Sequence, residues 1–281
     1  MATNTQPQDI TVSRSRLVHE LKGVYTIWYR DVLRFVRDRS RIFGSLAQPL
    51  LFLFALGFGV GQLGRAGLGG LPPNVPYIVF LYPGILCMTA LFTALFSAVS
   101  IVWDREFGFL REVLVAPVSR ISVALGKVAG GSTIAMIQAA LIMLLGPLLG
   151  VHYDFVRVVL MLLTLLLLAA VISSLGILIA ARQKTMEGFQ VIMQFLLLPM
   201  LFLSGAFFPL TGGGGTPALI LRTVAQINPM TYGVEAMRQI ALSGQLPSAL
   251  FLHSPGVDVL FLLGFFVVFL VPAVLLFSKQ D

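Results

Sequence analysis

Charge is scarce in this 281-residue sequence, of which only 11% is Asp, Glu, Lys or Arg. An average soluble domain carries about 25% charged residues. No charged residue occurs from Ala66 to Trp103 or from Val128 to Val151, and 57% of the chain is hydrophobic. These proportions exclude an ordinary soluble domain. They predict an all-α integral membrane protein that crosses the bilayer several times.

Residues that carry chemistry are also few. The single Cys87 lies within an apolar run, which excludes a disulfide framework and a thiolate metal cluster. The histidines His19, His152 and His253 are far apart, and we expect each to be solvated or interfacial rather than a metal ligand. The GxxxxGK[ST] phosphate loop and the GxSxG, HExxH and CxxC motifs do not occur. We therefore expect no catalytic residue, bound cofactor or metal in this chain.

Six apolar stretches approach or exceed the roughly 20 helical residues that a bilayer crossing needs. The predicted spans are residues 42–62, 77–102, 122–149, 158–181, 188–208 and 259–277. Charged residues do not occur in the centre of any of these spans. Intramembrane charge costs at least about 2.5–3.5 kcal/mol and usually marks an ion-coupled carrier. The spans therefore lack the charged residues that a proton-driven transporter uses, and we expect the energy for transport to come from another protein.

Three shorter helices accompany the spans. After a polar tail at residues 1–23, residues 24–40 carry apolar and aromatic side chains on one face and arginines on another. This pattern predicts an amphipathic helix in the headgroup plane, although a basic segment that only sets orientation is the alternative. The residues expected to act there are Trp28, Arg30, Arg34 and Arg37. Beyond the glycine-rich stretch at 211–216, two helices within residues 217–242 are too short to cross. We expect them to dip into the outer leaflet, the second one capped by Asn228.

Orientation follows from the distribution of Lys and Arg. With both termini cytoplasmic, fifteen of the nineteen basic residues fall on the cytoplasmic side of the predicted spans. Such a bias is typical of cytoplasmic loops. It also explains the net charge of +7 without any binding of nucleic acid. The sequence thus predicts cytoplasmic amino and carboxyl ends.

A charged block between the second and third spans is the most distinctive segment. If residues 104–114 form a short helix, its apolar side chains share one face and its charged side chains lie elsewhere. A ridge of this kind suits a groove on a partner protein, whereas a solvated loop is the alternative reading. The residues predicted to make this contact are Asp104, Arg105, Glu106, Phe107, Leu110, Arg111 and Glu112.

Taken together, these segments resemble the permease subunits of type-2 ABC exporters, in particular daunorubicin-resistance and nodulation-factor export permeases. The likeness is carried by LYPGILCMTALFTALFSAVSIVWDREFGFLREVLVAPVSR, YRDVLRFVRDRSR, FLSGAFFP and INPMTYGVEAMR. It extends from about Val24 to the carboxyl end. The TGGGG stretch at 211–215 departs from the family pattern.

The resemblance implies a transmembrane domain at residues 24–281 with an interface helix at 24–40, a coupling helix at 104–114 and re-entrant outer helices at 217–242. It implies a homodimer or heterodimer of permeases in the inner (plasma) membrane. Each copy would be docked on a separate ABC ATP-binding subunit, which binds ATP and Mg. The expected activity is export of an amphiphilic or lipid-like substrate, such as a drug, a lipid or a lipid-linked glycan.

An apolar wall between the two copies would then contact the substrate. The residues expected in this wall belong to the second and fifth spans and are Phe92, Phe96, Met193, Phe195 and Phe202. Two other functions stay open at the level of sequence. A self-sufficient channel or secondary carrier would show flux with this chain alone, and a membrane scaffold or assembly factor would show none.

Overall fold

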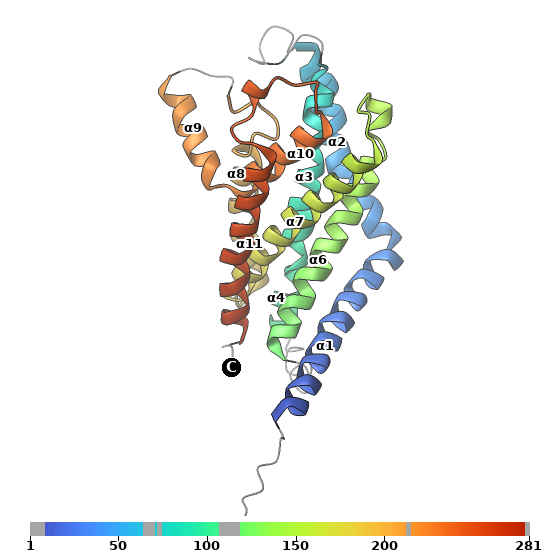
Figure 1. The fold of residues 1–281 in the computed structure, drawn as a ribbon, viewed down its shortest axis with the longest axis vertical. Coiled ribbons are helices and arrows are strands. Elements are labelled where there is room, and N and C mark those ends of the chain that lie inside the picture. Colours follow the sequence, from blue (N-terminus) through green and yellow to red (C-terminus); the bar gives the residue numbers. More distant parts are fainter. Residues whose placement is uncertain (1–8, 64–70, 72–74, 107–118, 212–214, 279–281) are drawn as a thin grey trace, which may run out of the picture.

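Helices form every regular element in the part of the chain described by the structure, which is a computed structural model. The described residues are 9–63, 71, 75–106, 119–211 and 215–278. Long helices lie side by side in a bundle, and short helices gather toward one end of it (Figure 1). Because these residues include no strand, the predicted all-α class is confirmed.

Five helical segments are long and apolar enough to cross a membrane. They are α2 (Arg39–Leu63), α3 (Tyr77–Ser97) continued by α4 (Val99–Glu106), α6 (Arg120–Met143), α7 (Phe155–Ala180) and α11 (Pro255–Ser278). These helices correspond to the first four predicted spans and the last one. The largest difference is at 122–149, where α6 ends at Met143. The chain then turns through Gly146 into the 3-10 helix η1 (Pro147–Leu149).

The predicted span at 188–208 is the exception, because its helix is shorter than expected. Helix α8 (Met186–Phe202) has 17 residues, at the lower limit for a bilayer crossing. The helix ends at Phe202, and Gly205 follows with a left-handed φ of 75°, which a right-handed helix cannot include. The chain then folds back and buries Phe207, which is 1% exposed. The structure therefore has five helices of clear spanning length and this shorter one, rather than six long helices.

The amino-terminal helix is longer than predicted and takes a different course. Helix α1 (Asp9–Arg37) begins within the expected tail and packs along α6 rather than lying flat across the end of the bundle (Figure 1). Glycines on α6 allow this approach. A Cβ atom at Gly126 would lie 2.8 Å from Cβ of Ile27, and one at Gly130 would lie 3.3 Å from Cβ of Asp31.

The two short helices expected before the last span are present as α9 (Thr216–Ile227) and α10 (Pro229–Ala241). The predicted cap of the second helix is confirmed, because Oδ1 of Asn228 accepts a hydrogen bond from the backbone N of Met230 at 3.0 Å. Helix α10 packs against α3, α7 and α11 and is buried along most of its length. Its depth in a membrane stays a prediction.

Both ends of the described chain lie at the same end of the bundle (Figure 1). The start of α6, the end of α4 and the turn between α7 and α8 lie there as well, and we call this the charged end. Helices α9 and α10 and the loop before α11 lie toward the opposite end. The described members of the predicted coupling segment, Asp104, Arg105 and Glu106, therefore belong to the charged end.

Candidate functional site

The predicted coupling helix is described only at its start. Asp104, Arg105 and Glu106 form the last turn of α4, so the helix of the second span continues directly into the charged block. The other four predicted residues fall within 107–118, outside the described residues; they are Phe107, Leu110, Arg111 and Glu112. What the structure does describe is how the two ends of this segment are held.

At the first end, Glu106 binds the start of α8. Its Oε2 accepts a hydrogen bond from the backbone N of Met186, the first residue of that helix, at 2.9 Å. Thr185 caps the same terminus by accepting from the backbone N of Gly188 at 3.3 Å. A carboxylate is stabilised there because the first backbone N–H groups of a helix carry a partial positive charge. The end of α4 is thereby joined to α8.

At the second end, Ser119 joins the start of α6 to α1. Its Oγ caps α6 by accepting from the backbone N of Ser122 at 3.1 Å. The hydroxyl groups of Ser119 and Ser122 both contact the carboxylate of Glu20 on α1. These hydrogen bonds lower the pKa of Glu20 because they stabilise its ionised form. Residues 107–118 therefore connect a contact with α8 to a contact with α1.

A buried lysine links three helices beside these contacts. Nζ of Lys127 on α6 lies 3.0 Å from Oδ2 of Asp31 on α1 and donates to Oγ of Ser100 on α4 at 2.9 Å. The Lys127 side chain is only 7% exposed. A buried ammonium group needs such partners because its loss of hydration is costly. Lys127 thus ties α1 to α4 at the end of the second span.

The predicted interface residues divide between the two faces of α1. Nε1 of Trp28 donates to Oγ1 of Thr133 on α6 at 3.0 Å. Arg30 is 60% exposed and makes only a long ion pair of 3.5 Å with Asp31. Arg34 and Arg37 are exposed as well. Three arginines therefore point away from the bundle, and their contact with acidic lipid stays a prediction.

The residues predicted to line a substrate path are found on α3 and α8, but not all are accessible. Phe195 and Phe202 are 84% and 47% exposed and lie about two turns apart on one face of α8. Phe96 on α3 is 43% exposed and stacks on Phe92, with ring centroids 6.5 Å apart. Met193 is 1% exposed and packs in the core of the chain. A path along these residues stays a prediction.

The sequence-based reasoning missed a group of buried ionisable residues toward the other end. Asp258 was left outside a span predicted to start at residue 259, yet it lies in the first turn of α11 and is fully buried. Arg238 was assigned to an outer segment, but it is 7% exposed and donates to the carbonyl groups of Gly205 and Ala206. His253 was expected to be solvated or interfacial, and its side chain is 19% exposed and lies between two carboxylates. The sequence did contain one signal of this buried group, because an acidic and a basic residue lie one turn apart in the otherwise largely apolar α10.

The sequence from α1 to α10 also matches known proteins. Residues 22–242 match the family described as ABC-2 type transporter. This chain belongs to the ABC-2 type transporter family. Among its relatives is the putative transport permease ycf38 of Cyanophora paradoxa, which is 32% identical over 220 residues that cover 78% of this chain and 73% of the relative. Nodulation protein J of Rhizobium meliloti (strain 1021) is 28% identical over 224 residues, 78% of this chain and 81% of the relative. The inner membrane transport permease YadH of Escherichia coli (strain K12) is 25% identical over 244 residues, which cover 86% of this chain and 91% of the relative.

The family resemblance seen in the sequence is thereby confirmed. The matched part of this ABC-2 permease includes the contact of Glu106 with α8, the residue Ser119, the Lys127 contact and the two short helices, whereas Glu20, the partner of Ser119, lies just before it. It ends before α11. Apart from Glu20, the residues that make the contacts described at the charged end therefore lie within the family domain.

Proposed function

We propose that this chain is the membrane-spanning subunit of an ATP-driven ABC exporter, powered by a separate ATP-binding subunit. The observation that carries this proposal is the double anchoring of residues 107–118. Glu106 joins one end of the segment to α8, and Ser119 joins the other end to α1. A partner that moves the segment therefore pulls on two helices at once. Lys127 spreads the displacement further because it connects α1, α4 and α6.

Six crossings fit the course of the chain. The start of the described chain and the end of α11 lie at the same end of the bundle (Figure 1), which requires an even number of crossings. Helix α8 supplies the sixth. Its 17 residues extend about 26 Å at 1.5 Å per residue, a few ångströms less than a hydrocarbon core of about 30 Å. Local thinning of the bilayer accommodates a difference of this size. The distribution of basic residues supports a cytoplasmic location for the charged end and for both termini.

The proposed partners are an ABC ATP-binding subunit and a second permease copy, identical or related. An exposed apolar stripe on α8 supports the second partner, because its members recur every three or four residues along one face. The stripe consists of Val191, Phe195, Leu198 and Phe202. A second copy facing this stripe would enclose an apolar path for an amphiphilic or lipid-like substrate leaving the cytoplasm. Aromatic side chains suit such a substrate because they offer large apolar surfaces.

Co-purification tests this proposal. The tagged chain is isolated from its native membrane, and the bound proteins are examined for a phosphate-loop ATPase and for ATP hydrolysis. We expect the wild-type chain to retain such an ATPase, and Glu106→Lys and Arg111→Glu to lose most of it. The matched control is Glu187→Lys, which makes the same charge change on an exposed residue one position after Met186. Retention of the ATPase by both coupling variants would overturn the assignment of residues 104–114.

A further inference from the structure

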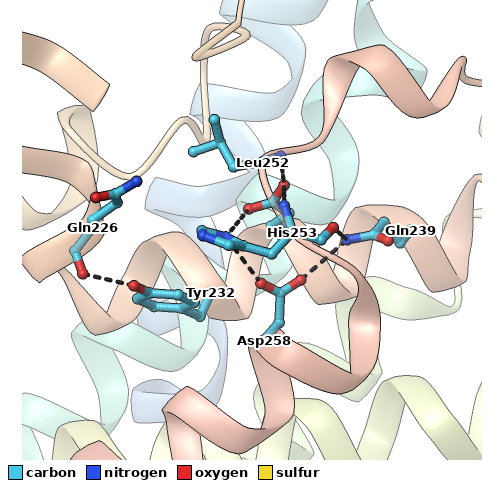
Figure 2. Close-up of polar contacts among 7 residues, drawn as sticks. Gln226, Tyr232, Gln239, Leu252, His253 and Asp258 are labelled. Atoms are coloured by element: carbon cyan, nitrogen blue, oxygen red, sulfur yellow. Dashed lines mark hydrogen bonds and ion pairs between the residues drawn. The ribbon is translucent and has the colours of Figure 1, made fainter. Parts of the chain in front are cut away.

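Three metal-ligating side chains meet between α10 and α11 (Figure 2). They are Glu235 on α10, His253 in the loop before α11, and Asp258 in the first turn of α11. Nδ1 of His253 lies 3.3 Å from Oε2 of Glu235 and 3.6 Å from Oδ1 of Asp258. One ligand atom from each residue lies within 4.8 Å of the other two. The chain thus gathers one imidazole nitrogen and two carboxylate oxygens around one point.

The second oxygen of each carboxylate is held by other groups. Oε1 of Glu235 accepts from the backbone N of Leu252 and from the backbone N of His253, the latter at 3.0 Å. Oδ2 of Asp258 accepts from Nε2 of Gln239 at 3.0 Å, and the same Nε2 lies 3.2 Å from the carbonyl oxygen of His253. Figure 2 shows these bonds around the three side chains. They fix the orientation of the carboxylates and leave one oxygen of each directed at the imidazole.

One of these oxygens lacks a hydrogen bond although it is buried. Asp258 is fully buried, and its Oδ1 accepts no hydrogen bond from the described residues. Two ionised carboxylates side by side in a buried place repel each other and need a compensating positive charge. The neighbouring Arg238 on α10 interacts electrostatically with Glu235, while its Nη2 donates to the carbonyl groups of Gly205 and Ala206. The hydroxyl of Tyr232, whose ring stacks on the imidazole, donates to the carbonyl oxygen of Gln226.

We propose that Glu235, His253 and Asp258 bind one divalent transition-metal ion, with Zn²⁺ as the best fit. Zinc bonds of about 2.0–2.2 Å in a tetrahedron separate neighbouring ligand atoms by about 3.3–3.6 Å. The two separations measured from Nδ1 are 3.3 and 3.6 Å. A neutral imidazole and two carboxylates carry a charge of −2, which a divalent ion cancels. The imidazole side chain is 19% exposed, which leaves the fourth position of the ion to water.

The surrounding groups match the supporting shell of a metal site. Ligating carboxylates in proteins are usually hydrogen-bonded through their second oxygen, as both are here. Sequence reasoning found no such site because its ligands are 18 and 5 residues apart along the chain, on two helices and a loop. The bound ion would fasten α10 and the loop before α11 to the first turn of α11. It would thereby hold the short outer helices against the last span.

Metal binding by the purified full-length chain tests this site. Protein in detergent is stripped with a chelator and titrated with ZnCl₂, while bound zinc and the unfolding temperature are measured. We expect one Zn²⁺ per chain and a rise in unfolding temperature with zinc. His253→Gln should weaken binding at least about 100-fold, and Gln239→Ala, which removes a supporting bond, by about 10- to 100-fold. The matched control is His152→Gln, an exposed histidine in the loop before α7, which should bind as the wild type does.

Two results would overturn the proposal. One is zinc binding by His253→Gln that equals binding by the wild type. The other is a wild-type chain that takes up no stoichiometric zinc and whose unfolding temperature depends on pH but not on metal. That second result would mean that a protonated His253 bridges the two carboxylates instead. The second measurement uses the wild-type chain, so it tests the proposed zinc site even if a variant fails to fold.

Discussion

At the residue scale, single polar side chains at the charged end each connect two or three helices. Lys127 contacts α1 and α4 from α6, and Glu106 contacts α8 from α4. The sequence predicted that Glu106, in the charged block, contacts a partner protein, which stays a prediction, and it did not predict the contact with α8. It did not identify the partners of Lys127, because Asp31 and Ser100 are distant in the chain and look like ordinary helix residues. Hydropathy shows where a polar residue interrupts an apolar segment, but it does not show which group forms a hydrogen bond or ion pair with that residue.

Lys127 offers a direct test of this linkage. Lys127→Met leaves Asp31 without its buried cation, so we expect a loss of about 1.5–3 kcal/mol in the free energy of unfolding, as for hydrogen bonds to charged groups. Arg30→Met, which removes an exposed cation from the same carboxylate, should change stability by less than about 0.5 kcal/mol. Unfolding in detergent measures both.

A double-mutant cycle separates this ion pair from other effects of the substitution. Lys127→Met combined with Asp31→Leu should destabilise the chain by less than the sum of the two single variants, with a coupling energy of about 0.5–3 kcal/mol. Strict additivity of the two changes would contradict a direct interaction between Lys127 and Asp31.

At the element scale, hydropathy predicted where the spans lie better than how the other helices pack. The helix in residues 24–40 was predicted from its amphipathic pattern, and α1 includes residues 24–37 of it, while α2 begins at Arg39. The pattern shows which face is apolar but not what covers that face. Here the cover is α6, whose glycines at 126 and 130 let the two helices approach closely. The length of α8 was overestimated because apolar residues continue past Gly205, where the backbone turns.

The contact between α1 and α6 predicts opposite effects for two similar substitutions. Gly126→Ala should destabilise the chain by about 1–3 kcal/mol, because the new Cβ would lie 2.8 Å from Cβ of Ile27. Gly44→Ala on α2 meets no heavy atom within 4 Å and should stabilise its helix by up to about 1 kcal/mol. The unfolding temperatures of the two variants are compared with that of the wild type. A shift of the unfolding temperature in the same direction for both would argue against the close packing of α1 on α6.

At the scale of the whole molecule, the chain is a helical bundle whose two ends differ in chemistry. The sequence assigned fifteen of its nineteen basic residues to the cytoplasmic side and predicted that both termini share that side. Both ends of the described chain do lie together at the charged end (Figure 1), and the cytoplasmic location of that end stays a prediction. The buried group around Asp258 could not be predicted, since it forms only when α10 and α11 pack together.

Cysteine labelling tests the proposed orientation and the crossing by α8. Cys87→Ser gives a background without cysteine, into which Lys184→Cys before α8 and Ser243→Cys after α10 are introduced singly. In intact cells, a membrane-impermeant maleimide should label position 243 at once and position 184 only after the membrane is opened. Labelling of both positions from the same side would mean that α8 does not cross.

The central claim is that this chain moves a solute only with energy received from another protein. Its most direct test is solute flux in vesicles that contain the purified chain, either alone or with its ATP-binding partner. We expect flux only when partner, ATP and Mg²⁺ are all present, and a large loss with Glu106→Lys but not with Glu187→Lys. Flux by the chain alone, without nucleotide, would overturn the proposed function and identify a self-sufficient channel or carrier.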